Sequence, residues 1–207
     1  MKILVVNLDR RKDRWDDFCK QAEKSKLIKK NHIRYRAVDG SLLSDSDMQG
    51  IITPTAYQHI KNNKPTQGLY FSSGALGLAK TYFDILSNCN DITLILEDDI
   101  IIHSDLDNQL FKSLEDLPDD WDILYIGWYK SAHLKIDILT ANIGKISGQI
   151  NGTQGWIINP KSCKKILEIF PLLYQIDTEI YRHKNLNKYC TVEPIISRSG
   201  SYSDIQN

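Results

Sequence analysis

Three consecutive acidic residues, Glu97, Asp98 and Asp99, directly follow the apolar run at residues 93–96. Burying unpaired carboxylates is costly, and a divalent cation removes that cost. Residues i and i+2 of an extended segment point to the same side, so Glu97 and Asp99 can bind one ion while Asp98 faces the other way. Hard oxygen ligands suit Mn²⁺ or Mg²⁺, which share their shell with phosphate oxygens. The cluster therefore predicts a metal site at Glu97 and Asp99; the alternative is that the acids cap an exposed turn.

The elements that must position this cluster alternate between strands and helices. Apolar runs predict strands at residues 2–8, 32–38, 92–96, 100–102, 121–126 and 153–158. Apolar residues at helical spacing predict helices over residues 15–22, 76–86, 106–117 and 163–173. A partly helical excursion is predicted over residues 41–72, and a loop along one sheet edge over residues 127–152. This alternation predicts an α/β fold, one domain over residues 1–207 with a mostly parallel central sheet flanked by helices. The cluster then lies at the carboxyl ends of strands, where open α/β sheets bind ligands.

Composition excludes several other classes of protein. The 207 residues contain 26 Lys and Arg against 26 Asp and Glu, and this zero net charge argues against nucleic acid as a partner. The four cysteines lack CxxC spacing, which favours reduced thiols over a zinc or redox site. The first apolar run is too short for a signal peptide, and no run is long enough to span a bilayer. We therefore expect a cytoplasmic protein, or a domain of a larger or a viral protein. The sequence does not indicate its oligomeric state.

Ordered blocks extend over almost the whole chain: VNLDRRKDR (6–14), RYRAVDG (34–40), GALG (74–77), LEDD (96–99), LPDDWDILYIG (117–127), GTQGW (152–156) and SDI (203–205). They resemble the blocks of the family 25 glycosyltransferases, which include bacterial lipooligosaccharide galactosyltransferases and collagen hydroxylysine galactosyltransferases. In this comparison Glu97-Asp98-Asp99 resembles the family's version of the DxD metal motif.

The resemblance implies a GT-A-like, Rossmann-like fold, a UDP-sugar donor, Mn²⁺ (Mg²⁺ also possible) and inversion at the anomeric carbon. Galactose and glucose are the favoured sugars. The acceptor stays open among a glycan, a lipid-linked sugar and a hydroxylated peptide. This chemistry agrees with the acid cluster, because a bound cation can stabilise the charge that builds on a departing diphosphate.

Donor contacts are predicted where the first two strands end. Arg11 and Arg14 can hold phosphate, and Asp39 can accept hydrogen bonds from ribose or uracil. The alternatives are a solvated helix face for the arginines and an Asx turn with Gly40 for Asp39. Further donor-binding candidates lie in the blocks that resemble the family: Asn7, Asp98, Thr153 and, more weakly, Asp204.

Inversion requires a base that takes the proton from the acceptor hydroxyl. The family's Asp after its late helix resembles Asp177 here, with Glu179 as second choice; a helix N-cap is the alternative for Asp177. Two departures affect the comparison: Thr81-Tyr82 replaces a Ser-His pair, so that Tyr82 could substitute as a hydrogen-bonding ring, and Gln175 replaces a Pro.

Other candidate residues carry weaker predictions. Glu179 and His183 share a helix face and suit a charge pair better than a metal, and His103 is expected in an exposed loop. Trp128, Tyr129 and Trp156 could stack on sugar rings or pack in the core. Two further functions stay open: a sugar-nucleotide-binding module that has lost transfer activity, and a nucleotidyltransferase, which the lack of a Gly-rich phosphate loop disfavours.

Overall fold

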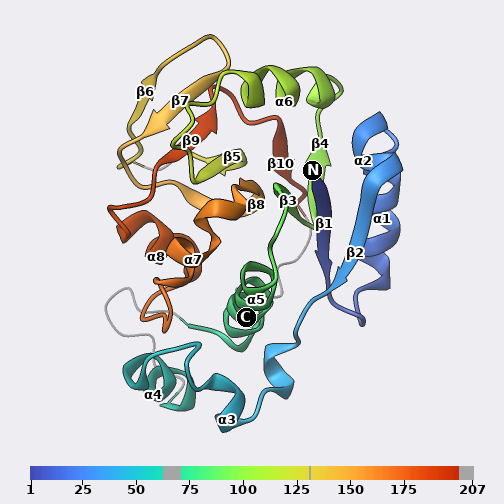
Figure 1. The fold of residues 1–207 in the computed structure, drawn as a ribbon. Helices are drawn as coiled ribbons and strands as arrows, with labels where there is room; N and C mark the ends of the chain where they lie inside the picture. Colours follow the sequence, from blue (N-terminus) through green and yellow to red (C-terminus); the bar gives the residue numbers. More distant parts are fainter. Residues whose placement is uncertain (63–70, 131, 201–207) are drawn as a thin grey trace.

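A computed structural model describes residues 1–62, 71–130 and 132–200. Within these residues a ten-stranded sheet forms the centre of the molecule (Figure 1). Along its main path the strands follow the order β2 (His32–Arg36), β1 (Lys2–Asn7), β3 (Thr93–Glu97), β8 (Asn151–Ile158), β5 (Ile123–Tyr129), β9 (Lys188–Thr191), β7 (Ile143–Ile146) and β6 (Ile136–Ile138). The short strand β10 (Ile196–Arg198) pairs with β5 and with β4 (Ile100–Ile102).

The predicted α/β fold is confirmed, and its sheet is mixed. β1 pairs in parallel with both β2 and β3, whereas β8 runs antiparallel to β3 and to β5. Because β8 runs antiparallel to β3, its first residues lie beside the last residues of β3. The carboxyl ends of β1 and β3 and the amino end of β8 therefore meet at one edge of the sheet.

Helices cover both faces of the sheet, as the alternating side chains of β1 require. Ile3 and Val5 pack on one face with α1 (Lys12–Ala22), α2 (Lys26–Asn31) and α6 (Leu106–Glu115). Leu4 and Val6 pack on the other face with α5 (Ser73–Ser87), α7 (Cys163–Leu167) and α8 (Ile176–Arg182). These four β1 side chains are at most 6% exposed, which explains why the strand is apolar on both faces.

The predicted elements differ from the structure mainly in the second half of the chain. The loop predicted over residues 127–152 is wrong in part, because it contains the end of β5 and the paired strands β6 and β7. The helix predicted over 163–173 ends at Leu167, and Pro171 cannot continue it. In the 41–72 region, η1 (Gly40–Leu42), α3 (Asp45–Met48) and α4 (Pro54–Asn62) confirm the helical excursion, and residues 63–70 lie outside the described part.

Among the helices of the described ranges, none is both long enough and apolar enough to cross a bilayer.

Candidate functional site

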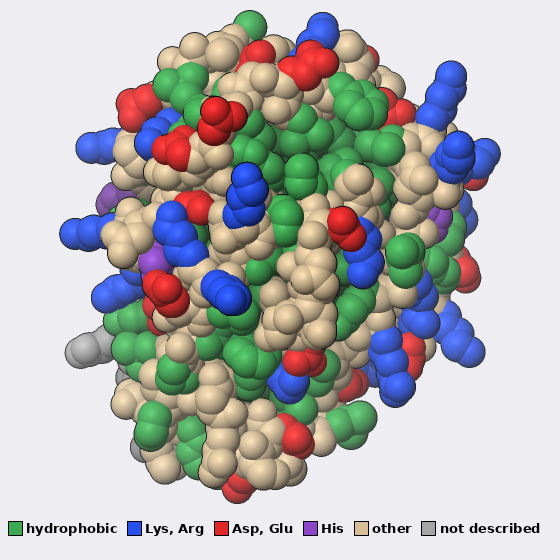
Figure 2. Space-filling view, in the orientation of Figure 1, with side chains coloured by type: hydrophobic (Ala, Val, Ile, Leu, Met, Phe, Trp, Pro, Cys, Tyr) green, Lys and Arg blue, Asp and Glu red, His purple; other side chains and the backbone are tan. Residues whose placement is uncertain are grey.

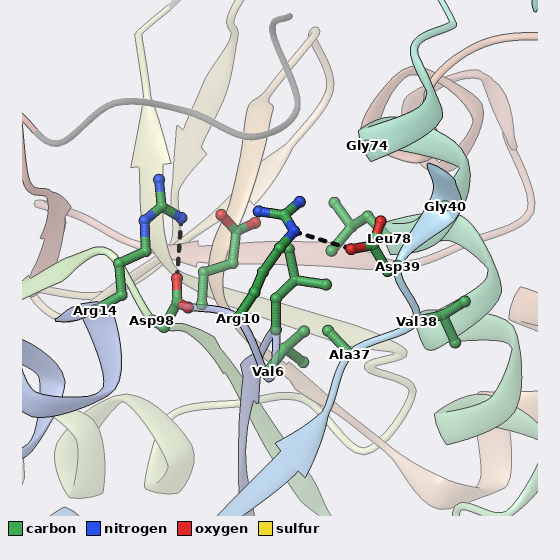
Figure 3. Close-up of a pocket in the computed structure, with 12 residues that line it drawn as sticks. Val6, Arg10, Arg14, Ala37, Val38, Asp39, Gly40, Gly74, Leu78 and Asp98 are labelled. Atoms are coloured by element: carbon green, nitrogen blue, oxygen red, sulfur yellow. Dashed lines mark hydrogen bonds and ion pairs between the residues drawn. The ribbon is translucent and has the colours of Figure 1, made fainter. Parts of the chain in front are cut away.

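A cleft lies at the carboxyl ends of β1 and β2. Its outer part has a volume of about 620 Å³ and extends over η1. Its inner part reaches Arg14, Glu97 and Asp98 (Figure 3). Both parts share the same wall, formed by Leu8, Arg10, Ala37, Val38 and Asp39. The cleft is therefore at the sheet edge where α/β folds bind their ligands.

The two aspartates of the acid cluster are buried and are neutralised by cations. Asp98 and Asp99 are 8% and 5% exposed. Arg14 donates from Nη1 to Asp98 Oδ1 over 3.1 Å, and its Nη2 lies 3.5 Å from Asp99 Oδ2. Arg198 Nε donates to the same Asp99 oxygen over 3.2 Å. Asn7 Nδ2 donates to Asp98 Oδ2 over 2.6 Å. These contacts offset the cost of burying two carboxylates side by side.

Glu97 lies at the end of β3 and is held by β8. The hydroxyl of Thr153 donates to Glu97 Oε1 over 2.6 Å, and the buried Tyr82 donates to the Thr153 carbonyl over 3.3 Å. Burial and the neighbouring charge of Asp99 raise the pKa of Glu97 to about 7. The hydroxyl of Thr153 thus contacts Glu97, and Tyr82 supports the strand that carries Thr153 from within the core.

The residues at the cluster fit a divalent cation that completes its shell with ligand oxygens. Among the described residues no group of three or more His, Cys, Asp or Glu could hold a metal ion. Two carboxylates are enough for Mg²⁺ or Mn²⁺ where phosphate oxygens supply the remaining ligands. The buried Oδ1 of Asp99 has no hydrogen-bond partner in the described part of the chain, which leaves one hard oxygen ready for a cation.

The predicted donor residues at the first two strands differ in placement. Asp39 lines the cleft, where Arg10 Nε donates to its Oδ2 over 2.9 Å (Figure 3). Its Oδ1 accepts from the amide and hydroxyl of Ser41, so the Asx-type turn is also present. Hydrogen bonds from Ser41 and then from Arg10 lower the pKa of Asp39.

Arg11 is not placed with the other predicted donor residues. Its guanidinium pairs with Asp13, two residues along the chain, at 2.8 Å, and Arg11 is not among the residues that line the cleft. Arg10, one residue earlier, lines the cleft at the place where Arg11 was expected. Arg14, one turn later, does reach the acid cluster.

Asp177 is joined to the acid cluster through the start of β8. Its Oδ2 accepts from the amide of Gly152 over 3.2 Å, one residue before the Thr153 that holds Glu97. Its Oδ1 accepts from the amide of Thr178 over 2.7 Å. Asp177 is the second residue of α8, and Gln175 is the N-cap. Asp177 is therefore not at the N-cap position that was its alternative, and it contacts the residue of β8 that precedes Thr153.

Glu179 has a different role from Asp177. Its Oε1 accepts from the amides of Leu173 and Tyr174, each over 2.8 Å, and so holds the segment before α8. The predicted pair with His183 is wrong, because the His183 ring lies 3.7 Å from Glu168 instead. Glu179, the second choice for the base, thus binds the backbone amides of the segment that precedes α8.

The aromatic and histidine candidates separate by burial. Trp156 is fully buried between the rings of Tyr82 and Tyr125, and Trp128 donates to the Thr191 carbonyl in the core. Tyr129, 38% exposed at the end of β5, is the accessible member of the predicted trio. His103 contacts Ser197, 3.3 Å away. Asp204 lies outside the described residues.

Two site residues were missed by the sequence interpretation, Arg10 and Arg198. Arg10 lies inside the block at residues 6–14, which also contains Arg11 and Arg14. The sequence alone does not show which of these three arginines face the cleft. Arg198 ends a strand of only three residues, β10, which is too short to give a periodic signal.

An α/β sheet with carboxylates and arginines gathered at its strand ends is typical of proteins that bind phosphate-bearing ligands. A family model described as glycosyltransferase family 25 (LPS biosynthesis protein) matches residues 1–180. The chain belongs to glycosyltransferase family 25, which confirms the resemblance found in the sequence blocks. Procollagen galactosyltransferase 2 from Mus musculus is 27% identical over 135 residues, which are 61% of this chain and 20% of that protein. The chain thus spans about a fifth of this relative's length.

Proposed function

We propose that the chain transfers a hexose, galactose or glucose, from a UDP-sugar to a hydroxyl of a glycan, lipid-linked or hydroxylated-peptide acceptor. The proposal includes a divalent cation, Mn²⁺ or Mg²⁺, at Glu97 and Asp99, and inversion at the anomeric carbon. It rests on the family and on one geometric observation. Consecutive residues of β8 bind Glu97 on one side and Asp177 on the other.

The residues of the cleft divide the work of the transfer reaction. Arg10, Arg14 and Asp39 line the cleft. In the proposed complex the nucleoside would lie beside Arg10 and Asp39, and the diphosphate beside Arg14. Bound at Glu97 and Asp99, the cation would act as a Lewis acid on the leaving diphosphate. Asp177 takes the proton from the acceptor hydroxyl as that oxygen attacks. Gly152 and Thr178, by donating to its carboxylate, hold Asp177 in one orientation.

The experiment that tests this function is the release of UDP from a panel of UDP-sugars, with Mn²⁺ and with EDTA. Donor hydrolysis requires no knowledge of the acceptor. We expect release from one UDP-sugar, abolished by EDTA and by Asp99→Asn, because the amide removes a charged ligand oxygen. Asp17→Asn is the matched control, since Asp17 is 73% exposed and pairs only with Lys20 in the described part of the chain.

Three other results would each contradict part of the proposal. UDP binding without release from any UDP-sugar would indicate the inactive sugar-nucleotide-binding module. Release of pyrophosphate would indicate a nucleotidyltransferase. Full activity of Asp99→Asn would exclude Asp99 as a metal ligand.

A further inference from the structure

A second groove lies away from the cleft, between β7, the carboxyl end of α8 and the start of β9. Its volume is about 690 Å³. The cationic side chains that line it come from three separate segments: Lys145, Arg182, Lys184 and Lys188. No carboxylate lines this groove among the described residues. Figure 2 shows several Lys and Arg side chains on the side of the molecule where β7 and α8 lie. The groove therefore presents positive charge in a chain whose net charge is zero.

Three of these four cations are available to a ligand. Lys188 is not, because its buried Nζ donates to the carbonyls of Ile180, Tyr181 and His183 at the end of α8. Among the described residues Lys145, Arg182 and Lys184 form no ion pair. This contrasts with the arginines of the cleft, which pair with acids.

Aromatic rings hold two of the available cations in place. The Arg182 guanidinium lies 4.6 Å from the centre of the Tyr174 ring, and Lys145 Nζ lies 5.7 Å from that of Tyr189. Contact with a ring face orients a cation and leaves its N–H donors for another partner. An anion that enters the groove would therefore meet donors that are already oriented, at a reduced cost in side-chain entropy.

Helix α8 connects this groove to the candidate base. Asp177 is in its first turn, and Tyr181, which lines the groove, follows four residues later on the same face of the helix. Four residues of α-helix correspond to about 6 Å along the axis. A short oligosaccharide whose reacting hydroxyl lies at Asp177 can therefore extend along this face of α8 as far as the groove.

We propose that this groove binds an anionic group, a phosphate or a carboxylate, carried by the acceptor at a distance from the hydroxyl that receives the sugar. This inference rests on the proposed function, because it assigns the acceptor to the class of acidic glycans. Charge-assisted hydrogen bonds from Lys145, Arg182 and Lys184 would hold the anion. The remaining part of the acceptor would lie along α8.

The test measures binding of defined probes to the full chain by calorimetry. The probes are a tetrasaccharide with uronate carboxylates, a phosphorylated disaccharide, and a neutral tetrasaccharide of N-acetylglucosamine. We expect one or both acidic probes to bind at least about tenfold more tightly than the neutral one. The triple variant Lys145→Gln, Arg182→Gln, Lys184→Gln should lose about tenfold or more in affinity for them. Comparison of the two acidic probes distinguishes carboxylate from phosphate.

The matched control is Lys26→Gln, Lys30→Gln, Lys112→Gln, which removes three exposed charges from α2 and α6. We expect it to bind as the wild type does, and thermal melts of both variants check that they fold. Unchanged binding by the groove variant, or equal binding of neutral and acidic probes, would overturn the proposal. Tighter binding of a single-stranded oligonucleotide than of either acidic probe would overturn it in favour of nucleic acid.

UDP release by the wild-type chain, measured in parallel, reports on the proposed function alone. If the wild type releases UDP and the groove variant still binds the acidic probes, only the groove assignment fails. If the acidic probes bind through the groove but no UDP-sugar is turned over, the transfer reaction fails and the acceptor role of the groove fails with it.

Discussion

Asp177 and Glu179 are both carboxylates in the first turns of α8, and their partners separate them. Asp177 accepts from the start of β8, beside Glu97, whereas Glu179 accepts from the two amides before its own helix. The sequence predicts both as candidates for the base because a residue type and a spacing do not specify which amides a carboxylate meets. That choice depends on where β8 lies, which is a property of the tertiary structure.

Asp177→Asn should lower kcat of transfer by about 10²- to 10⁴-fold while the affinity for the UDP-sugar changes little, because a base is lost and the donor contacts remain. Glu179→Gln should instead lower the free energy of unfolding by about 1–3 kcal/mol, since two amides lose a charged acceptor. Steady-state kinetics and urea unfolding of both variants check this. A larger loss of kcat in Glu179→Gln than in Asp177→Asn would reverse the assignment.

The raised pKa of Glu97 predicts a pH dependence for the metal-free chain. Burial raises this pKa from 4.5 in the unfolded chain to about 7 in the folded one, so between these values the folded chain binds more protons. The contribution of Glu97 to stability is therefore greatest below about pH 4.5 and is lost as the pH rises through about 7. We expect the melting temperature of the wild type, relative to Glu97→Gln, to fall over this range.

Adding Mn²⁺ at pH 7.5 should recover the stability lost by the wild type, because the cation compensates the buried charge, and should recover less in Glu97→Gln. Melting curves across pH with EDTA and with Mn²⁺ test both statements. A difference between the two proteins that stays constant with pH would show that folding does not raise the pKa of Glu97.

Among the elements, α5 is positioned by two glycines that face each other. A Cβ at Gly77 would collide with the Val38 carbonyl and lie 2.6 Å from the Gly40 amide nitrogen. A Cβ at Gly40 would collide with the carbonyl of Ser73. Both glycines are therefore required by the close approach of α5 to the segment that carries Asp39. The GALG block is therefore required for the packing of α5, and it is also one of the blocks that resemble the family.

Gly77→Ala should push α5 away from residues 38–40 and lower the free energy of unfolding by about 1–3 kcal/mol, the usual cost of overpacking. It should also weaken UDP binding, because Asp39 moves with that segment. Ser87→Ala, at the exposed end of the same helix, is the control and should change neither property. Urea unfolding and calorimetry with UDP make the measurement; a Gly77→Ala chain as stable as the wild type would contradict the close packing.

Elements of five or more residues with a clear apolar pattern could be predicted from the sequence, among them β1, β3 and α5. Of the shorter strands, β4 could be predicted as a run of three isoleucines, whereas β6, β7 and β10 are too short for a periodicity to show. Their pairing partners, not their own residues, stabilise them as strands. For the same reason the site could be predicted where it depends on β1 and β3, and not where it depends on Arg198.

At the scale of the whole molecule, the site joins residues from both ends of the described chain. β10 pairs with β4 and β5 and so brings Arg198 to Asp99, across a sequence separation of 99 residues. The family match ends at residue 180, before this strand. The neutralisation of Asp99 therefore depends on a segment beyond the matched range.

Arg198→Gln should lower the free energy of unfolding of the metal-free chain by about 1–3 kcal/mol, because the buried Asp99 loses one of its two cations. Mn²⁺ should restore part of this loss and should bind the variant more tightly than the wild type. Arg36→Gln, which removes a side chain 81% exposed, is the control and should have little effect on either property. Urea unfolding with and without Mn²⁺ tests this; equal stability of both metal-free variants would contradict it.

The antiparallel course of β8 has a consequence for how members of such a fold can vary. One peptide unit of β8, from Gly152 to Thr153, joins the residue that donates to Asp177 and the residue that donates to Glu97. In the reaction proposed above, the carboxylate near the leaving diphosphate and the base would thus be anchored on neighbouring residues of one strand, whose rise per residue is nearly invariant. Loops elsewhere could then lengthen, shorten or change their charge, and so admit new acceptors, while these two anchor points keep their spacing.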